Sequence, residues 1–119
     1  MKVFIKATNL KLTSEIRKAI EEKISPLDRF IPNIKVPLKA FVEVGLANRH
    51  HQKGDIYYAE VNLNLPGKIL RSEAREETAY KAINTIKDEL QLLLKKYTEK
   101  KIARREKALI SLKTKYRES

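Results

Sequence analysis

Residues 56–74, IYYAEVNLNLPGKILRSEA, decide the fold of this 119-residue chain. Apolar and polar side chains alternate from Ile56 to Leu65, which is the period of a strand with one buried face. Pro66-Gly67 suits the centre of a tight turn, because Pro fixes φ at the second turn position and Gly tolerates a positive φ at the third. Residues 68–74 then continue as a further short strand. The stretch predicts an antiparallel hairpin with a core-facing set of Tyr57, Ala59, Val61, Leu63 and Leu65.

Two more strands are expected on the N-terminal side of this hairpin. Residues 38–46 repeat the alternation, and residues 48–55 form a polar loop between this strand and the hairpin. Residues 2–7 alternate with the same period of two. The chain therefore contains four expected strands, of which the last three form an antiparallel meander.

Two amphipathic helices complete the expected elements. Thr13 stands at the N-cap of the first, where its hydroxyl can accept a backbone N–H. An inward stripe follows it at Ile16, Ile20, Ile24 and Leu27. Pro26 predicts a kink or a restart, with a last turn that reaches Phe30. The second helix begins near residues 76–78 and carries the stripe Ala79, Ile83, Ile86, Leu90, Leu93, Leu94 and Tyr97.

The order β-α-β-β-β-α predicts a two-layer α+β fold, with a four-stranded sheet, two helices on one face and the other face open. We assign residues 1–98 to this domain and residues 99–119 to a basic C-terminal tail. Beyond Tyr97 the apolar stripe decays while helix propensity continues. The tail is therefore a projecting helix, disordered, or ordered only on a partner.

Positive charge is concentrated at the end of the chain. The net charge is +11, and residues 95–119 contribute +7 of it, with ten basic and three acidic side chains. Charge segregated in this way indicates a polyanionic partner, and a phosphate-rich polymer is the first candidate.

Several classes of function are disfavoured by composition. The chain has no cysteine, which rules out disulfides, thiolate zinc sites and a thiol nucleophile. With three glycines and no serine in a glycine-framed turn, it offers neither a nucleophile elbow nor a phosphate-cradling loop. We interpret His50-His51 as a pair of loop residues and expect no metal. Together with the exclusions above, this predicts a protein with no cofactor, no small-molecule substrate and no enzymatic activity. The absence of a signal peptide or an apolar span predicts a cytoplasmic protein.

Aromatic and basic side chains are the remaining candidates for a binding site. Phe4, Phe41 and Tyr58 are expected on the outer face of the sheet, where they either stack bases or, more commonly, pack against neighbours. On a helical wheel Lys81 and Lys95 point away from the apolar stripe. Any one lysine can be a solvated surface residue, but a +11 excess favours salt-dependent contact with phosphates.

Several sequence blocks stand in a specific order and spacing: IKATNLKLT at residues 5–13, Ile16-Arg17, LDRF at 27–30, YKAIN at 80–84, Leu90 and KKY at 95–97. Together, over roughly residues 1–105, they resemble the family of ribosome hibernation promoting factors and the ribosome-associated inhibitor (protein Y). The resemblance implies a domain similar to double-stranded-RNA-binding domains that docks on the small ribosomal subunit across the tRNA and mRNA sites. Such a protein holds ribosomes inactive under stress or in stationary phase.

Candidate rRNA-binding residues follow from this resemblance and from the helical wheel. Basic positions of the family correspond to Arg17, Lys23, Arg29, Arg75, Lys95, Lys96 and Lys100. Arg104 and Arg105 match a basic pair in the tail of the inhibitor branch, and Lys81 comes from the wheel. The chain departs from the family pattern at Thr78-Ala79-Tyr80, Glu89, Leu92 and Pro26. Its length resembles the short members, which lack a dimerisation domain, and its tail resembles the inhibitor branch.

Two other interpretations remain open. The chain can be a generic double-stranded RNA binder or a constitutive ribosomal protein. Alternatively, a basic amphipathic tail can lie on acidic membranes, although Ile102, Leu109, Leu112 and Tyr116 are sparse anchors for that role. Away from the ribosome we expect a monomer.

Overall fold

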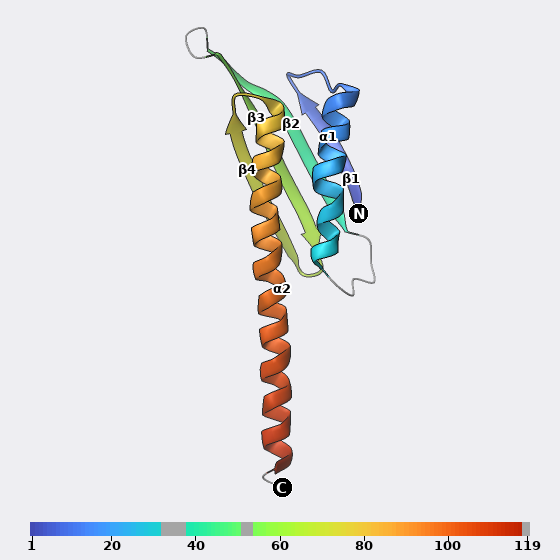
Figure 1. The fold of residues 1–119 in the computed structure, drawn as a ribbon, viewed down its shortest axis with the longest axis vertical. Coiled ribbons are helices and arrows are strands. Elements are labelled where there is room, and N and C mark those ends of the chain that lie inside the picture. The colour runs from blue at the N-terminus through green and yellow to red at the C-terminus, as the bar shows by residue number, and fades with distance from the viewer. Residues whose placement is uncertain (32–37, 51–53, 118–119) are drawn as a thin grey trace.

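The computed structural model describes residues 1–31, 38–50 and 54–117, with the backbone alone at 48–50 and 113–117. The elements follow one another in the order β1 (Lys2–Thr8), α1 (Ser14–Ile24), the 3-10 helix η1 (Ser25–Phe30), β2 (Lys39–His50), β3 (Gly54–Leu65), β4 (Lys68–Glu76) and α2 (Ala79–Arg117). Both α-helices lie on one face of a four-stranded sheet, as Figure 1 shows. The predicted α+β fold class is confirmed.

The strands are ordered β1-β2-β3-β4 across the sheet. β1 pairs with β2 in parallel, whereas β2 with β3 and β3 with β4 are antiparallel. A parallel pair needs a crossover connection, and α1 supplies it. The meander predicted for the last three strands is confirmed, and the parallel pairing of β1 with β2 adds an edge strand to it.

The first helix begins and ends as its side chains dictate. The Thr13 hydroxyl accepts a hydrogen bond from the Ile16 amide at 3.2 Å. The α-helix stops at Ile24, and a 3-10 helix with Pro26 in its first turn continues to Phe30. Since proline has no N–H to donate to the preceding turn, the chain restarts at this position as expected.

The two hairpins differ in how well their ends were predicted. Gly67 has φ +75°, which agrees with a turn that needs glycine at its third position. The loop predicted at residues 48–55 is too long, because β2 extends to His50 and β3 begins at Gly54. Backbone pairing of residues 49 and 50 with residues 55 and 54 maintains the strands beyond the apolar core. Strands that extend beyond the core can carry polar side chains, so the polar sequence of residues 48–55 was not evidence for a loop.

The core lies between the helices and the inner face of the sheet. Ile16, Ile20 and Ile24 of α1 are buried there, opposite alternating residues of β2 and β3 such as Val44 and Val61. The predicted stripe of α2 is buried except for Leu93, which is partly exposed, and Ala82 joins it. Thr78 caps this helix, since its hydroxyl accepts from the Lys81 amide at 3.1 Å.

The second helix continues far beyond the core. It runs without interruption to Arg117, and every side chain from Glu99 to Leu112 is exposed. The Cα radius of gyration is 18.9 Å, compared with about 13.5 Å for a compact chain of this length. Of the three states considered for the tail, the structure has the projecting helix (Figure 1).

Candidate nucleic-acid interface

All ten predicted basic residues are exposed. Arg17 and Lys23 lie on α1, Arg29 lies on η1, and six others lie on α2: Lys81, Lys95, Lys96, Lys100, Arg104 and Arg105. Arg75 is different, because it lies on β4 in register with Tyr58, whereas Leu70 and Ser72 of the same strand point into the core. The alternation of a strand therefore places Arg75 on the open face of the sheet, away from the helices. Nine of the ten candidates thus lie on helices, and three of these, Lys100, Arg104 and Arg105, lie on the part of α2 that projects beyond the core.

Two of these candidates meet at one aromatic ring. The guanidinium carbon of Arg29 lies 5.1 Å from the centroid of Phe30, and the Lys95 ammonium lies 5.9 Å from the same centroid. The Thr98 hydroxyl donates a hydrogen bond of 3.1 Å to the Phe30 carbonyl, which attaches the end of η1 to α2. Arg29 and Lys95, which are 66 positions apart, thus lie against the same ring. We call this group the Phe30 junction (Arg29, Phe30, Lys95 and Thr98).

The acidic neighbour of the junction is engaged elsewhere. The carboxylate of Asp28 forms an ion pair with the N-terminal amine of Met1, with 3.0 Å between nitrogen and oxygen. Within the described part of the chain, neither Arg29 nor Lys95 forms an ion pair, and Lys81 is the only one of the ten candidates that does, with Glu77 at 3.5 Å. The two cations of the junction are therefore available to an external anion.

Candidates on α2 do not all face the same way. Lys95 and Lys96 are consecutive, so their side chains point about 100° apart around the helix axis. The side chain of Lys95 points toward Phe30, so the side chain of Lys96 points away from that ring. Farther along, Lys100 and Arg104 are four residues apart, as are Lys101 and Arg105, so each pair shares a side of the helix.

The face of α2 that packs on the sheet becomes basic in the tail. Lys101 follows the buried Tyr97 by one turn, and its ammonium lies 5.1 Å from the Tyr97 ring centroid. Arg104 continues the same direction, because it follows Tyr97 by about two turns, whereas Arg105 lies about 80° farther around the helix. Sequence reasoning did not include Lys101 or Phe30 in the site. The adjacency of Arg29 and Phe30 was the only local signal for the junction.

Other predicted features can be placed as well. His51 lies outside the described residues, and the side chain of His50 does too. Across the side chains that are described, no group of three His, Cys, Asp or Glu could hold a metal ion. Among the described residues, no helix is both long and apolar enough to cross a membrane.

The outward aromatics lie where they were predicted. Phe4 and Phe41 stack on each other with centroids 5.0 Å apart and planes at 12°. The Tyr58 hydroxyl donates to the Glu43 carboxylate, and this bond raises the pKa of Tyr58 above its ordinary value. The expectation that these side chains pack against neighbours is confirmed, although both phenyl rings stay more than 40 % exposed.

Comparison with known proteins decides the family. Residues 3–102 match the model of the family described as sigma 54 modulation protein / S30EA ribosomal protein. The chain belongs to this family. The resemblance stated from the sequence blocks is confirmed by this match and by curated relatives.

Curated relatives of the S30EA family share about 30% of their residues with this chain. A ribosome hibernation promotion factor from Deinococcus radiodurans is 30% identical over 98 residues, which cover 82% of this chain and 49% of the relative. One from Staphylococcus aureus is 31% identical over 96 residues, which cover 78% and 46%. The chain thus spans about half the length of the curated relatives that it matches.

Two solved structures share the fold. The Protein Y N-terminal domain from Thermus thermophilus is 30% identical with a TM-score of 0.66, over 82% of this chain and 99% of that domain. A ribosomal subunit interface protein from Coxiella burnetii has a TM-score of 0.65 at 18% identity, over 82% and 97%, and supports the fold alone.

Proposed function

We propose that this chain is a cytoplasmic ribosome hibernation factor that binds small-subunit rRNA at the tRNA and mRNA sites and keeps ribosomes inactive under stress. Membership of the S30EA family and the relatives named ribosome hibernation promotion factor support a ribosome-associated role that involves no enzymatic chemistry. The Phe30 junction is the observation that carries the rRNA contact, because it places two cations on one ring, neither of them in an ion pair with a described residue.

The basic surface accounts for affinity without sequence readout. Each phosphate that a lysine or arginine neutralises releases condensed counterions, which gives binding that weakens steeply with salt. Phosphate contacts of this kind fix the position of a protein on RNA rather than read bases. The candidates on α1, on η1 and on the part of α2 that covers the sheet therefore orient the domain with its helices toward rRNA and its open sheet face away.

The tail adds a second set of contacts in this proposal. Its exposed cations, among them Lys100, Arg104 and Arg105, extend along the projecting helix. We assign to them a path along the mRNA site, while the folded domain supplies docking. Before it meets the ribosome, the chain is a monomer in this proposal.

Co-sedimentation with purified small subunits tests the proposal. The full chain should pellet with the subunits at about 50 mM salt and remain largely in the supernatant at a few hundred millimolar. Replacing both Arg29 and Lys95 with glutamine should reduce binding about 10-fold at fixed salt, since two phosphate contacts are lost. Lys18→Gln and Lys87→Gln remove two charges from residues already in ion pairs and serve as the matched control.

Failure has a clear form. If the chain does not pellet at low salt, or if the control pair loses as much binding as the junction pair, the assignment of the Phe30 junction is wrong. Chemical footprinting then separates a hibernation factor from a generic duplex binder. Protection confined to the tRNA and mRNA sites, together with loss of translation, supports the first, whereas equal protection of any long duplex supports the second.

A further inference from the structure

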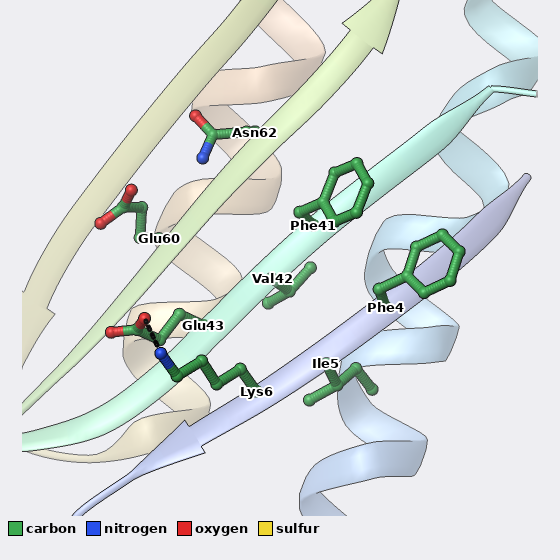
Figure 2. A pocket seen from close by; sticks show the side chains of 8 residues that line it. All are labelled: Phe4, Ile5, Lys6, Phe41, Val42, Glu43, Glu60 and Asn62. Atoms are coloured by element: carbon green, nitrogen blue, oxygen red, sulfur yellow. Dashed lines mark ion pairs between the residues drawn. The ribbon is translucent and has the colours of Figure 1, made fainter.

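The open face of the sheet carries a second feature, unrelated to the basic helices. The strand register places Phe4, Phe41, Asn62 and Arg71 in one cross-strand row, and Lys6, Glu43, Glu60 and Glu73 in the next. A shallow pocket of about 240 Å³ opens between these two rows on β1, β2 and β3. Figure 2 shows the two rings beside each other at its rim, with the carboxylates of Glu43 and Glu60 farther along the strands.

The phenyl rings offer an unused surface. Phe4 is 45% exposed and Phe41 42%, although stacking on each other already covers one face of each. Phe41 is paired across β2 and β3 with Asn62, whose amide lines the same pocket. An aromatic face beside hydrogen-bonding groups is a site for a flat polar group rather than for an aliphatic one.

The charges that line the pocket indicate which kind of ligand it favours. On a chain of net charge +11, this pocket is lined by two carboxylates, Glu43 and Glu60, and one cation, Lys6. The carboxylates make one end of the pocket favourable for a cation, whereas the exposed Lys2 and Lys39 lie on the other side of the phenyl rings. Among flat cations, a guanidinium stacks on aromatic rings and donates up to five hydrogen bonds to carboxylates.

The carboxylates retain capacity for such a ligand. Glu43 accepts from the Tyr58 hydroxyl, and Lys6 approaches it only to 3.9 Å while staying 76% exposed. Glu60 is paired with Arg71 at 3.1 Å. A carboxylate accepts about four hydrogen bonds, so each has positions left, and Lys6 is held loosely enough to be displaced.

We propose that this pocket binds an arginine side chain from a basic protein segment, with the guanidinium stacked on Phe41 and donating to Glu43 and Glu60. The segment lies across the open face of the sheet, which the proposed rRNA contact leaves free. The inference extends beyond the proposed function and does not depend on it, since it involves the opposite face of the molecule.

The test is a binding titration with the full chain and a short peptide of alternating glycine and arginine, followed by backbone amide NMR. We expect shifts confined to residues of the two cross-strand rows. The same peptide with lysine in place of arginine should bind about 2- to 5-fold more weakly, because it lacks the planar fork. Phe41→Leu keeps an apolar side chain and should weaken arginine-peptide binding by about the same factor.

Charge variants give effects of opposite sign. Glu60→Gln should weaken peptide binding several-fold, whereas Lys6→Gln should strengthen it, because it frees Glu43. Glu89→Gln makes the same charge change on an exposed position of α2 and should have no effect. Thermal unfolding of each variant confirms that the fold is retained.

Three results would overturn the inference. Equal binding of the arginine and lysine peptides, unchanged by Phe41→Leu, would show general electrostatic attraction. A single-stranded oligonucleotide that shifts the same residues, and whose binding Lys6→Gln weakens, would make the pocket a base-stacking site. Self-association that Phe41→Leu abolishes would make the occupant a second copy of this chain.

Discussion

A chain that ends at Thr98 should be as stable as the full chain and yet bind the small subunit more weakly. The truncation retains the hydrogen bond from Thr98 to Phe30 and therefore the Phe30 junction. It removes residues 99–119, which carry eight basic and three acidic side chains. No side chain from 99 to 112 is buried, so little apolar area leaves a protected environment.

The two expected magnitudes follow from these contacts. The stability loss is confined to the cation–π contact of Lys101 with Tyr97, which at an exposed site is worth about 0.5 kcal/mol. The salt dependence changes more. Each lost phosphate contact lowers the slope of log K against log salt by about 0.7 to 0.9, so eight contacts would lower it by about 6 to 7.

Urea unfolding followed by circular dichroism measures the first quantity, and co-sedimentation across a salt series measures the second. A loss of more than about 1.5 kcal/mol on truncation would mean that the tail packs on the domain, because exposed helix interactions are far weaker. An unchanged salt slope would mean that the tail cations do not contact phosphate.

Three further variants test the domain itself. A Cβ at Gly45 would lie 2.6 Å from the Thr8 carbonyl oxygen and from the Tyr58 ring, so Gly45→Ala should lower the free energy of unfolding by about 1 to 3 kcal/mol, and an unchanged urea midpoint would contradict this. Leu90 is fully buried, so Leu90→Ala should lower the free energy of unfolding by about 2 to 5 kcal/mol in the same assay. A loss under about 1 kcal/mol would mean that the surrounding side chains collapse into the space. Because hydrogen bonding to Glu43 raises the folded-state pKa of Tyr58, its stabilisation is complete below the ordinary tyrosine pKa of 10.0 and is lost as pH rises through the folded pKa. Tyr58→Phe should therefore flatten the fall of the urea midpoint above about pH 10, and parallel pH profiles would refute that cause.

The elements of this fold are predictable because they depend on local periodicity. The alternation at residues 56–65 and the stripe from Ala79 to Tyr97 each identify a buried face without knowledge of the partner. Thr13 and Pro26 mark the two ends of α1 for equally local reasons. The extension of β2 to His50 could not be predicted in this way, because backbone pairing outside the core imposes no hydrophobic pattern.

The site is less predictable because it depends on contacts between distant residues. Single basic positions can be chosen from the sequence, but the sharing of Phe30 by Arg29 and Lys95 requires the packing of η1 on α2. The stack of Phe4 on Phe41 likewise requires the parallel register of β1 with β2. Arg75 is a candidate through the family resemblance alone, and its place on the open face of the sheet follows from the register of β4 with β3.

The unbroken helix α2 links the orientation of the tail to that of the domain. Residues 99–117 of this rod extend about 28 Å, and each residue adds about 1.5 Å and a turn of about 100°. Inserting one residue after Thr98 would hardly change how far the tail reaches, but it would rotate every tail cation by more than a quarter turn. Inserting seven would restore the phase while moving the cations outward by about 10 Å. The angular setting and the reach of the tail can therefore be varied separately by the length of a single helix.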